Sequence, residues 1–178
     1  MAGRKTCPPL VHQTEKVCVP LLQSHVTAVT PHHPICHVPQ LPLVHVDDVR
    51  PENMKEGEGW AISEFRLPIS GRNGSSTTLF HSIFRPGSTH ARHLHRNCDE
   101  IAVYLKGHGV VGLGNERTEV RAGHCRLMPK GMEHFFYNET KNEEALVVGF
   151  YAGAKSVEDT GYVYTGEVTG ADIKARTA

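Results

Sequence analysis

The sequence predicts a single all-β domain, a sandwich or a barrel, and three observations indicate it. Short apolar runs recur from Trp60 onward at intervals of about 8–12 residues, the spacing typical of such folds. Glycine or proline stands at nearly every junction between the runs. No stretch of this region shows a helical period, and 178 residues suit one domain with a proper core.

The composition excludes several classes of function. Nineteen basic and nineteen acidic residues balance, so no global charge draws the chain to nucleic acid or to an anionic membrane. No run approaches 18 apolar residues, so no membrane-spanning helix is predicted. The apolar piece Val17–Leu22 is shorter than a signal-peptide core of roughly 7–15 residues, and the five cysteines form no CxxC pair. We therefore expect a soluble, cytoplasmic protein.

Residues 1–46 differ in composition from the rest of the chain. They hold three of the cysteines, six of the histidines and most of the prolines. Proline is disfavoured in helix interiors and in central strands, so these residues are predicted to form an extended or disordered arm. Within the arm, His32, His33 and His37 could bind a stray metal ion, but so many prolines leave them no fixed geometry. The segment Leu41–Val49 could dock as an edge strand.

The predicted β domain spans residues 47–165, and eight of its apolar runs each look like one strand. In chain order the runs are WAISEFRLPI, STTLFHSIF, EIAVYLKG, HGVVGLG, RTEVRAG, HCRLMPKG, EHFFYNET and EALVVGFYAG. Residues 166–178 form a polar, glycine-containing tail. We expect the tail to continue an extended segment along the domain and to fray at its end.

The segment HARHLHRNCDE, residues 90–100, carries the most chemical information. Alternate side chains of a strand face the same side, so His93 and His95 point together and make a two-imidazole clip for a transition metal. If the next strand returns antiparallel, the carboxylate of Glu100 comes back beside the two histidines. His134 opens a later strand, which could bring its imidazole across the barrel to the same point.

Three neutral imidazoles and one carboxylate suit a divalent transition metal ion such as Fe(II), Mn(II), Ni(II), Co(II), Cu(II) or Zn(II). Four protein ligands leave up to two open positions on an octahedral ion, which is a catalytic rather than a closed structural arrangement. The alternative is a set of surface or core histidines that fits this pattern by coincidence.

With these residues in place, the chain resembles the cupin superfamily. The first half of the cupin motif is matched, in register, by Gly87, His93, His95, Glu100 and Gly107. The second half is matched by Gly123, Pro129, Gly131, His134 and Asn138. The fifteen residues between the halves fall in the family's usual short range. Two complete half-motifs are far more specific than a lone His-x-His, and the resemblance covers roughly residues 60–152.

The resemblance implies a small single-domain, metal-binding cupin of the RmlC-like type. Its fold would be an antiparallel β-barrel, or jelly roll, with the irregular N-terminal arm outside the barrel and the metal near one mouth. The resemblance assigns ligand roles to His93, His95, Glu100 and His134, and it leaves Asn138 as a structural hydrogen-bonding residue at a strand end. A homodimer is common in the family and is expected here, also from the exposed outer strands and the apolar piece around Trp60, with a monomer as the alternative.

Strand parity gives a provisional lining for the metal pocket. If Glu100 faces inward, so does Tyr104, and if His134 faces inward, so does Phe136. The two rings would then line the pocket beside the metal, and Tyr104 would add a phenol group. An ordinary position in the hydrophobic core is an equally good interpretation for each. His90 has the wrong parity to share a face with the histidine pair on a regular strand. A place in a loop or behind the ligands is favoured for it over a role as fifth ligand or proton shuttle.

The expected function is that of a metal-dependent enzyme acting on a small organic molecule. Fe(II) dioxygenase chemistry is the favoured version, with iron as the expected ion. A Lewis-acid lyase, isomerase or decarboxylase would use the same ligands. A non-catalytic cupin that binds a small molecule is the third hypothesis, although a sensor usually carries an output domain and no helix-turn-helix pattern is present in the sequence.

Overall fold

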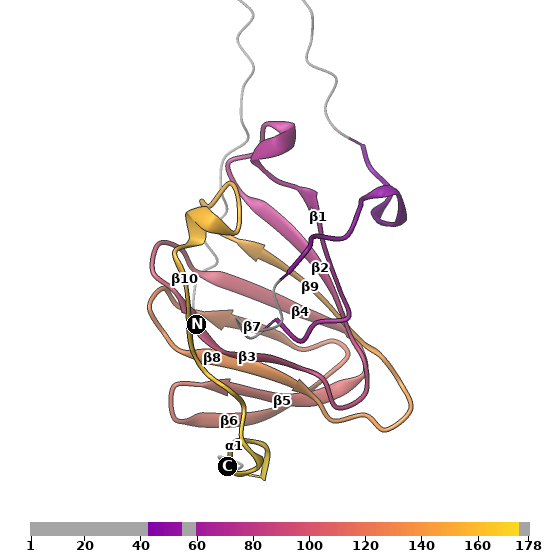
Figure 1. The fold of residues 1–178 in the computed structure, drawn as a ribbon, viewed down its shortest axis with the longest axis vertical. Helices are drawn as coiled ribbons and strands as arrows, with labels where there is room; N and C mark the ends of the chain where they lie inside the picture. Colours follow the sequence, from indigo (N-terminus) through magenta and orange to yellow (C-terminus); the bar gives the residue numbers. More distant parts are fainter. Residues whose placement is uncertain (1–42, 55–59, 175–178) are drawn as a thin grey trace, which may run out of the picture. The chain divides into compact units, whose positions relative to one another are not determined.

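In the computed structural model, the described residues, 43–54 and 60–174, form two five-stranded antiparallel sheets packed face to face (Figure 1). The first sheet has the strand order β1-β2-β9-β4-β7, and the second has the order β10-β3-β8-β5-β6. This nearly all-β architecture of two antiparallel sheets confirms the predicted fold class.

The strands of the first sheet are β1 (Glu64–Ile69), β2 (Thr78–Phe84), β9 (Ala145–Tyr151), β4 (Glu100–Lys106) and β7 (Cys125–Met128). Those of the second are β10 (Tyr162–Gly166), β3 (Thr89–His95), β8 (His134–Asn138), β5 (His108–Leu113) and β6 (Glu116–Arg121). The helical elements are short: the 3-10 turns Val46–Asp48, Gly71–Asn73 and Glu158–Thr160, and the helix α1 (Gly170–Lys174). No helix in the described part of the chain is long and apolar enough to cross a membrane.

The core lies between the two sheets and follows from the two-residue period of their strands. Along β2, buried and partly exposed side chains alternate without a break, which turns Phe80 and Phe84 inward. Phe84 meets Phe136 of β8 edge to face, with ring centroids 4.8 Å apart. Such aromatic pairs contribute about 0.5–1.5 kcal/mol beyond the burial of their area, so this contact helps to hold one sheet on the other.

Two residues of the motif shape the connections between strands. Gly107 joins β4 to β5 with a φ of +79°, and a Cβ there would lie 2.9 Å from Ala145, so only glycine suits the crossing from one sheet to the other. Asn138 is fully buried, and its side-chain amide donates to the carbonyl oxygens of Phe84 (2.8 Å) and Glu143 (3.1 Å). The expectation of a structural role for Asn138 is confirmed.

The C-terminal segment contains a strand and a short helix that the sequence does not predict. Residues 162–166 form the strand β10, which pairs with β3, and α1 follows it. Asp172 explains this short helix, because its carboxylate accepts hydrogen bonds from the backbone N–H and hydroxyl of Thr169 and from Arg117 of β6. One turn of helix fixed by such contacts is too short to show a helical period in the sequence.

Two expectations about the N-terminal half are also corrected. The described part of Leu41–Val49 contains a 3-10 turn capped by the side chain of His45, and it contains no strand. Trp60 is buried, with 3% of its surface exposed, so it supplies no exposed apolar surface for a dimer. Most of the predicted arm, residues 1–42, lies outside the described residues.

Candidate metal centre

His93 and His95 lie two residues apart on β3, and both are almost completely buried on its inner side. The third histidine comes from the neighbouring strand, since β8 pairs with β3 and His134 stands directly opposite His93 in the register. The three imidazoles therefore belong to one sheet. The expectation that His134 reaches the site from across the barrel is wrong.

Glu100 is the candidate ligand that comes from the opposite sheet. It opens β4, which pairs with β7 and β9 in the other sheet and has no pairing with β3. The expected antiparallel return beside β3 does not form, because the backbone N–H groups of Arg96 and Asn97 bond to the carbonyl oxygens of Gly161 and Thr160. The connection thus leaves the β3 sheet before β4 begins.

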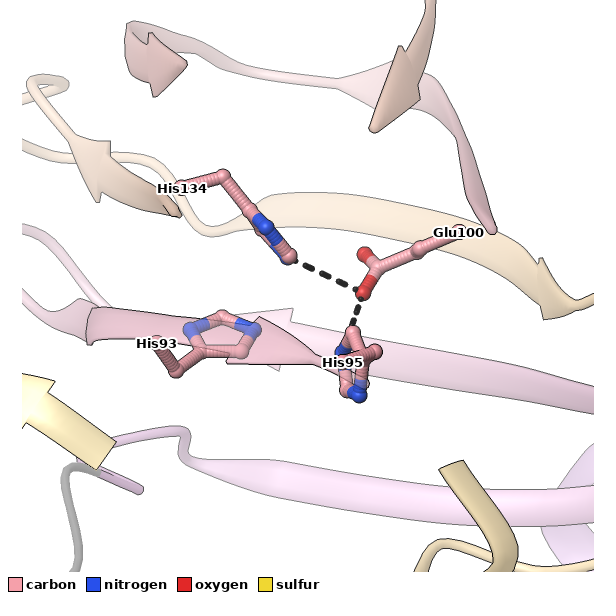
Figure 2. Close-up of side chains that lie close together, drawn as sticks. All are labelled: His93, His95, Glu100 and His134. Atoms are coloured by element: carbon pink, nitrogen blue, oxygen red, sulfur yellow. Dashed lines mark hydrogen bonds and ion pairs between the residues drawn. The ribbon is translucent and has the colours of Figure 1, made fainter. Parts of the chain in front are cut away.

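The four side chains converge on one point between the sheets (Figure 2). Their candidate ligand atoms all lie within 4.8 Å of one another. One carboxylate oxygen of Glu100, Oε2, lies 2.9 Å from Nε2 of His95 and 3.2 Å from Nε2 of His134. This brings together every residue that the sequence analysis selected as a ligand.

The surroundings of the imidazoles prepare their Nε2 atoms for a metal. Nδ1 of His93 lies 2.7 Å from the carbonyl oxygen of Ala91, and Nδ1 of His134 lies 3.0 Å from that of Met132. Each Nδ1–H donates to its carbonyl, so Nε2 is the ring nitrogen that an ion would bind, in His134 after loss of its proton to the solvent. Nε2 of His93 is buried and has no hydrogen-bond partner among the described residues. Such an atom costs about 1–3 kcal/mol unless a partner is present, so the cluster fits a divalent metal ion.

The protonation states of the clustered side chains also suit a divalent metal ion. Burial lowers the pKa of His93 well below its ordinary value, so this imidazole is neutral. Burial alone would raise the pKa of Glu100, but the hydrogen bonds and charge of His134 and then His95 outweigh it, and the pKa lies below the usual range. Burial, the largest single cause, lowers the pKa of His134, but the hydrogen bond and charge of Glu100, the Met132 carbonyl and the charge of Glu133 together outweigh it, and the net direction is upward. A metal ion would displace the proton of His134, so binding should weaken as the pH falls.

A small cavity of about 30 Å³, room for one or two water molecules, adjoins the cluster. Tyr104 and Phe136 both line it, with ring centroids 5.4 Å apart. Burial raises the pKa of the Tyr104 phenol, which therefore keeps its proton. Most of the remaining wall is apolar. Its polar side chains, apart from the ligand candidates, are Ser82, His90, Tyr104 and Tyr151.

His90 also lines this cavity, because β3 is not a regular strand. The register between β3 and β8 shifts between His90 and His93, so both side chains face inward despite their odd spacing. The imidazole of His90 stacks on that of His93, with centroids 3.8 Å apart. Burial lowers the pKa of His90 to about 3, which leaves it neutral. It is not one of the four side chains whose ligand atoms cluster.

Sequence reasoning missed two aromatic residues at the site. Trp60 lies against His90, with ring centroids 4.3 Å apart, and Tyr162 of β10 lies 5.0 Å from His93 by the same measure. The two rings also contact each other, at 4.8 Å. Both come from segments outside the motif, and the strand that carries Tyr162 was not predicted.

A buried cluster of three imidazoles and one carboxylate between the sheets of a jelly roll defines the class of metal-binding cupins. The comparison with protein families agrees, since residues 80–150 match the cupin domain model Cupin_2. The chain therefore contains a cupin domain.

Curated relatives include oxalate oxidases and germin-like proteins. Oxalate oxidase GF-3.8 of Triticum aestivum is 32% identical over 114 residues, which are 59% of this chain and 51% of that protein. Germin-like protein 3-5 of Oryza sativa subsp. japonica is 36% identical over 88 residues, 45% of this chain and 39% of that protein. The chain spans about half the length of the oxalate oxidases it matches.

Solved structures show the same fold. A cupin-like protein from Thermotoga maritima superposes with a TM-score of 0.53 at 19% identity, covering 62% of this chain and 78% of that one. A structure of oxalate oxidase gives a TM-score of 0.50 at 26% identity, covering 65% of this chain and 60% of that one.

Proposed function

We propose that the protein is a metal-dependent oxidoreductase that reacts a small carboxylate with dioxygen, and that oxalate is the first substrate to test. The observation that carries the proposal is the buried cluster of His93, His95, Glu100 and His134 beside a small cavity. The similarity to oxalate oxidases supports the carboxylate substrate. The proposal keeps the oxygen-dependent chemistry favoured by the sequence and places Fe(II) and Mn(II) ahead of the other ions.

In this proposal the three histidines and Glu100 hold the ion. A bound redox-active ion would supply open positions for substrate and dioxygen and a path for electrons between them. The Glu100 carboxylate offsets one of the two positive charges of a divalent ion, so the centre keeps a net positive charge that attracts a carboxylate. No lysine or arginine of the described chain lines the cavity to supply another positive charge.

The small size of the cavity restricts the substrate to a compact molecule. A volume of about 30 Å³ leaves no room for a large ring system without rearrangement of the core. Phe136 and the other apolar side chains exclude bulk water from the centre, and the protonated phenol of Tyr104 can donate a hydrogen bond. Oxidation of oxalate breaks its carbon–carbon bond and releases two carbon dioxide molecules. The two electrons pass to dioxygen, which takes up two protons and becomes hydrogen peroxide.

The test is reconstitution of the metal-free protein with Fe(II), Mn(II), Co(II) or Zn(II) in separate samples. Oxygen uptake with oxalate, together with release of peroxide and carbon dioxide, is expected only with the iron or manganese sample. The variant His134→Gln should abolish uptake and metal retention, whereas His108→Gln, an exposed histidine of β5, should leave both unchanged. Turnover of substrate by the zinc sample without oxygen would replace this proposal with Lewis-acid chemistry. Binding without turnover in any sample would leave a binding protein.

We also propose that two copies of the chain pair through the outer face of the β1-β2-β9-β4-β7 sheet. Ile101 stands opposite both Leu127 and Phe150 in the register, and all three side chains are exposed. An outer sheet face that water covers normally carries polar residues, so this row favours a partner. The proposed partner is a second copy of the chain, because a two-fold axis would pack this apolar row against the same row of the second copy.

A further inference from the structure

The imidazole of His90 is held in a fixed place beside the candidate metal centre. One face stacks on His93, with ring centroids 3.8 Å apart, and Trp60 lies at 4.3 Å. The backbone adds a restraint, because Trp60 and His90 form an isolated antiparallel bridge. The residue is 8% exposed, so its orientation is set by packing rather than by solvent.

Within this arrangement, Nε2 of His90 is buried and has no hydrogen-bond partner among the residues that the structure describes. A buried nitrogen of this kind costs about 1–3 kcal/mol unless a partner is supplied. The residue lines the cavity that also touches His93, Glu100 and His134. A molecule bound in that cavity is therefore in a position to supply the partner.

We propose that His90 binds the substrate, with Nε2–H donating a hydrogen bond to a substrate oxygen that the ion does not hold. This inference rests on the proposed function, since it assigns a second contact to the carboxylate substrate at the same centre. The cavity lining includes no lysine or arginine from the described part of the chain. The neutral N–H of His90 has a fixed orientation, so it selects a substrate by the position of its oxygen atoms rather than by its charge.

The contact narrows the class of substrate. A molecule that chelates the ion through two oxygen atoms and still offers a third to His90 needs oxygen atoms on two adjacent carbons, as in oxalate or a 2-hydroxy or 2-oxo acid. Acetate has only two oxygen atoms, so when both hold the ion none is left for His90, and acetate should gain little from it. Discrimination between oxalate and acetate therefore reports on His90 separately from the ion.

The experiment uses the full chain loaded with Co(II), whose visible absorption follows the ligands of the ion. Oxalate and acetate are titrated into wild type, His90→Phe, His90→Leu and His90→Gln. Phenylalanine keeps a ring for the stack but removes the N–H, leucine removes both in a smaller side chain, and glutamine restores a donor. Metal content and thermal unfolding are measured for every variant.

We expect all three variants to retain one equivalent of metal. His90→Phe and His90→Leu should weaken oxalate binding about tenfold or more, leave acetate binding nearly unchanged, and be partly rescued in His90→Gln. Unchanged oxalate affinity in both apolar variants would mean that His90 only packs, and loss of the metal would make it a fifth ligand. Either outcome overturns the inference while oxygen uptake by the wild type still upholds the proposed function. If the wild type binds no oxalate, both the role of His90 and the proposed function are wrong.

Discussion

Asp172 offers a direct test of how the C-terminal segment is fastened to the barrel. Its carboxylate lies 2.7 Å from a guanidinium nitrogen of Arg117 in β6 and 3.9 Å from Arg92 in β3. The side chains of Asp172 and Arg117 are only 9% and 13% exposed. Arg92 directly precedes His93 in the sequence, so this ion pair links α1 to the strand that carries two candidate ligands.

The size of the effect follows from the pKa of Asp172. Burial alone would raise it, but the hydrogen bonds from Thr169 and Arg117 outweigh burial and lower the pKa from 3.8 to about 2. Lowering the pKa from 3.8 to about 2 corresponds to about 2.5 kcal/mol at about 1.4 kcal/mol per pKa unit, and partial solvent screening brings the contribution of the carboxylate to the free energy of unfolding to about 2 kcal/mol. The substitution Asp172→Asn removes the charge at nearly constant shape and should lower the stability at pH 7 by about that amount.

The pH dependence has a definite sign. The pKa of Asp172 is lower in the folded than in the unfolded chain, so its contribution is complete above the unfolded value of about 4. It is lost as the pH falls through the folded value of about 2. The difference in stability between wild type and Asp172→Asn should therefore shrink between pH 4 and pH 2.

Urea unfolding of both proteins at pH 7, pH 4 and pH 3 measures this difference. The matched control is Glu143→Gln, whose carboxylate lies 3.6 Å from Lys106 with both side chains about half exposed. A surface pair of this kind contributes about 0–1 kcal/mol, so the control should change little. A gap between wild type and Asp172→Asn that is the same at pH 7 and pH 3, or no larger than that of the control, would refute the argument.

Three further predictions concern the ion, the core and the outer sheet face. Removal of the metal with a chelator should lower the stability by about 4 kcal/mol relative to ion at 1,000 times its Kd, or roughly 10 °C in Tm by calorimetry. The substitution Gly149→Ala would press a Cβ into the Phe80 ring and the Ile101 carbonyl, and should cost about 1–3 kcal/mol or more in urea unfolding. Gly170→Ala, with open space around it, is its control and should stay within about 0.5 kcal/mol. Ile101→Lys should convert a dimer to a monomer in sedimentation without loss of metal, and a wild type that sediments as a monomer would contradict the proposed interface.

The ligands were predictable from the sequence because their signal is local. The two-residue period of a strand is enough to turn His93 and His95 to one side, and the spacing of the motif supplied Glu100 and His134. The partner strands were not predictable in the same way. Residues 96–97 bond to residues 160–161, more than sixty positions away, and this long-range pairing sends β4 into the opposite sheet.

The position of His90 could not be predicted from the alternation of side chains along a strand. The expectation that it faces away from His93 assumes a regular strand, whereas the register shift in β3 places both imidazoles on the inner side. A bulge depends on the hydrogen bonds of the partner strand and leaves no fixed mark in the sequence. Trp60 and Tyr162 were missed for a related reason, because their contacts with His90 and His93 exist only after distant segments pack together.

The division of the ligands between the sheets has a consequence for how metal and fold are coupled. Three imidazoles come from β3 and β8 in one sheet, and the only carboxylate comes from β4 in the other. An ion held by all four would join the two sheets at the core, so any loosening of the sheet contact would weaken its binding. The same reasoning works in reverse, since an ion that binds only the packed arrangement stabilises the contact between the sheets. The aromatic pair Phe84 and Phe136, which spans the sheets beside the cavity, should therefore affect metal affinity although neither ring can bind a metal.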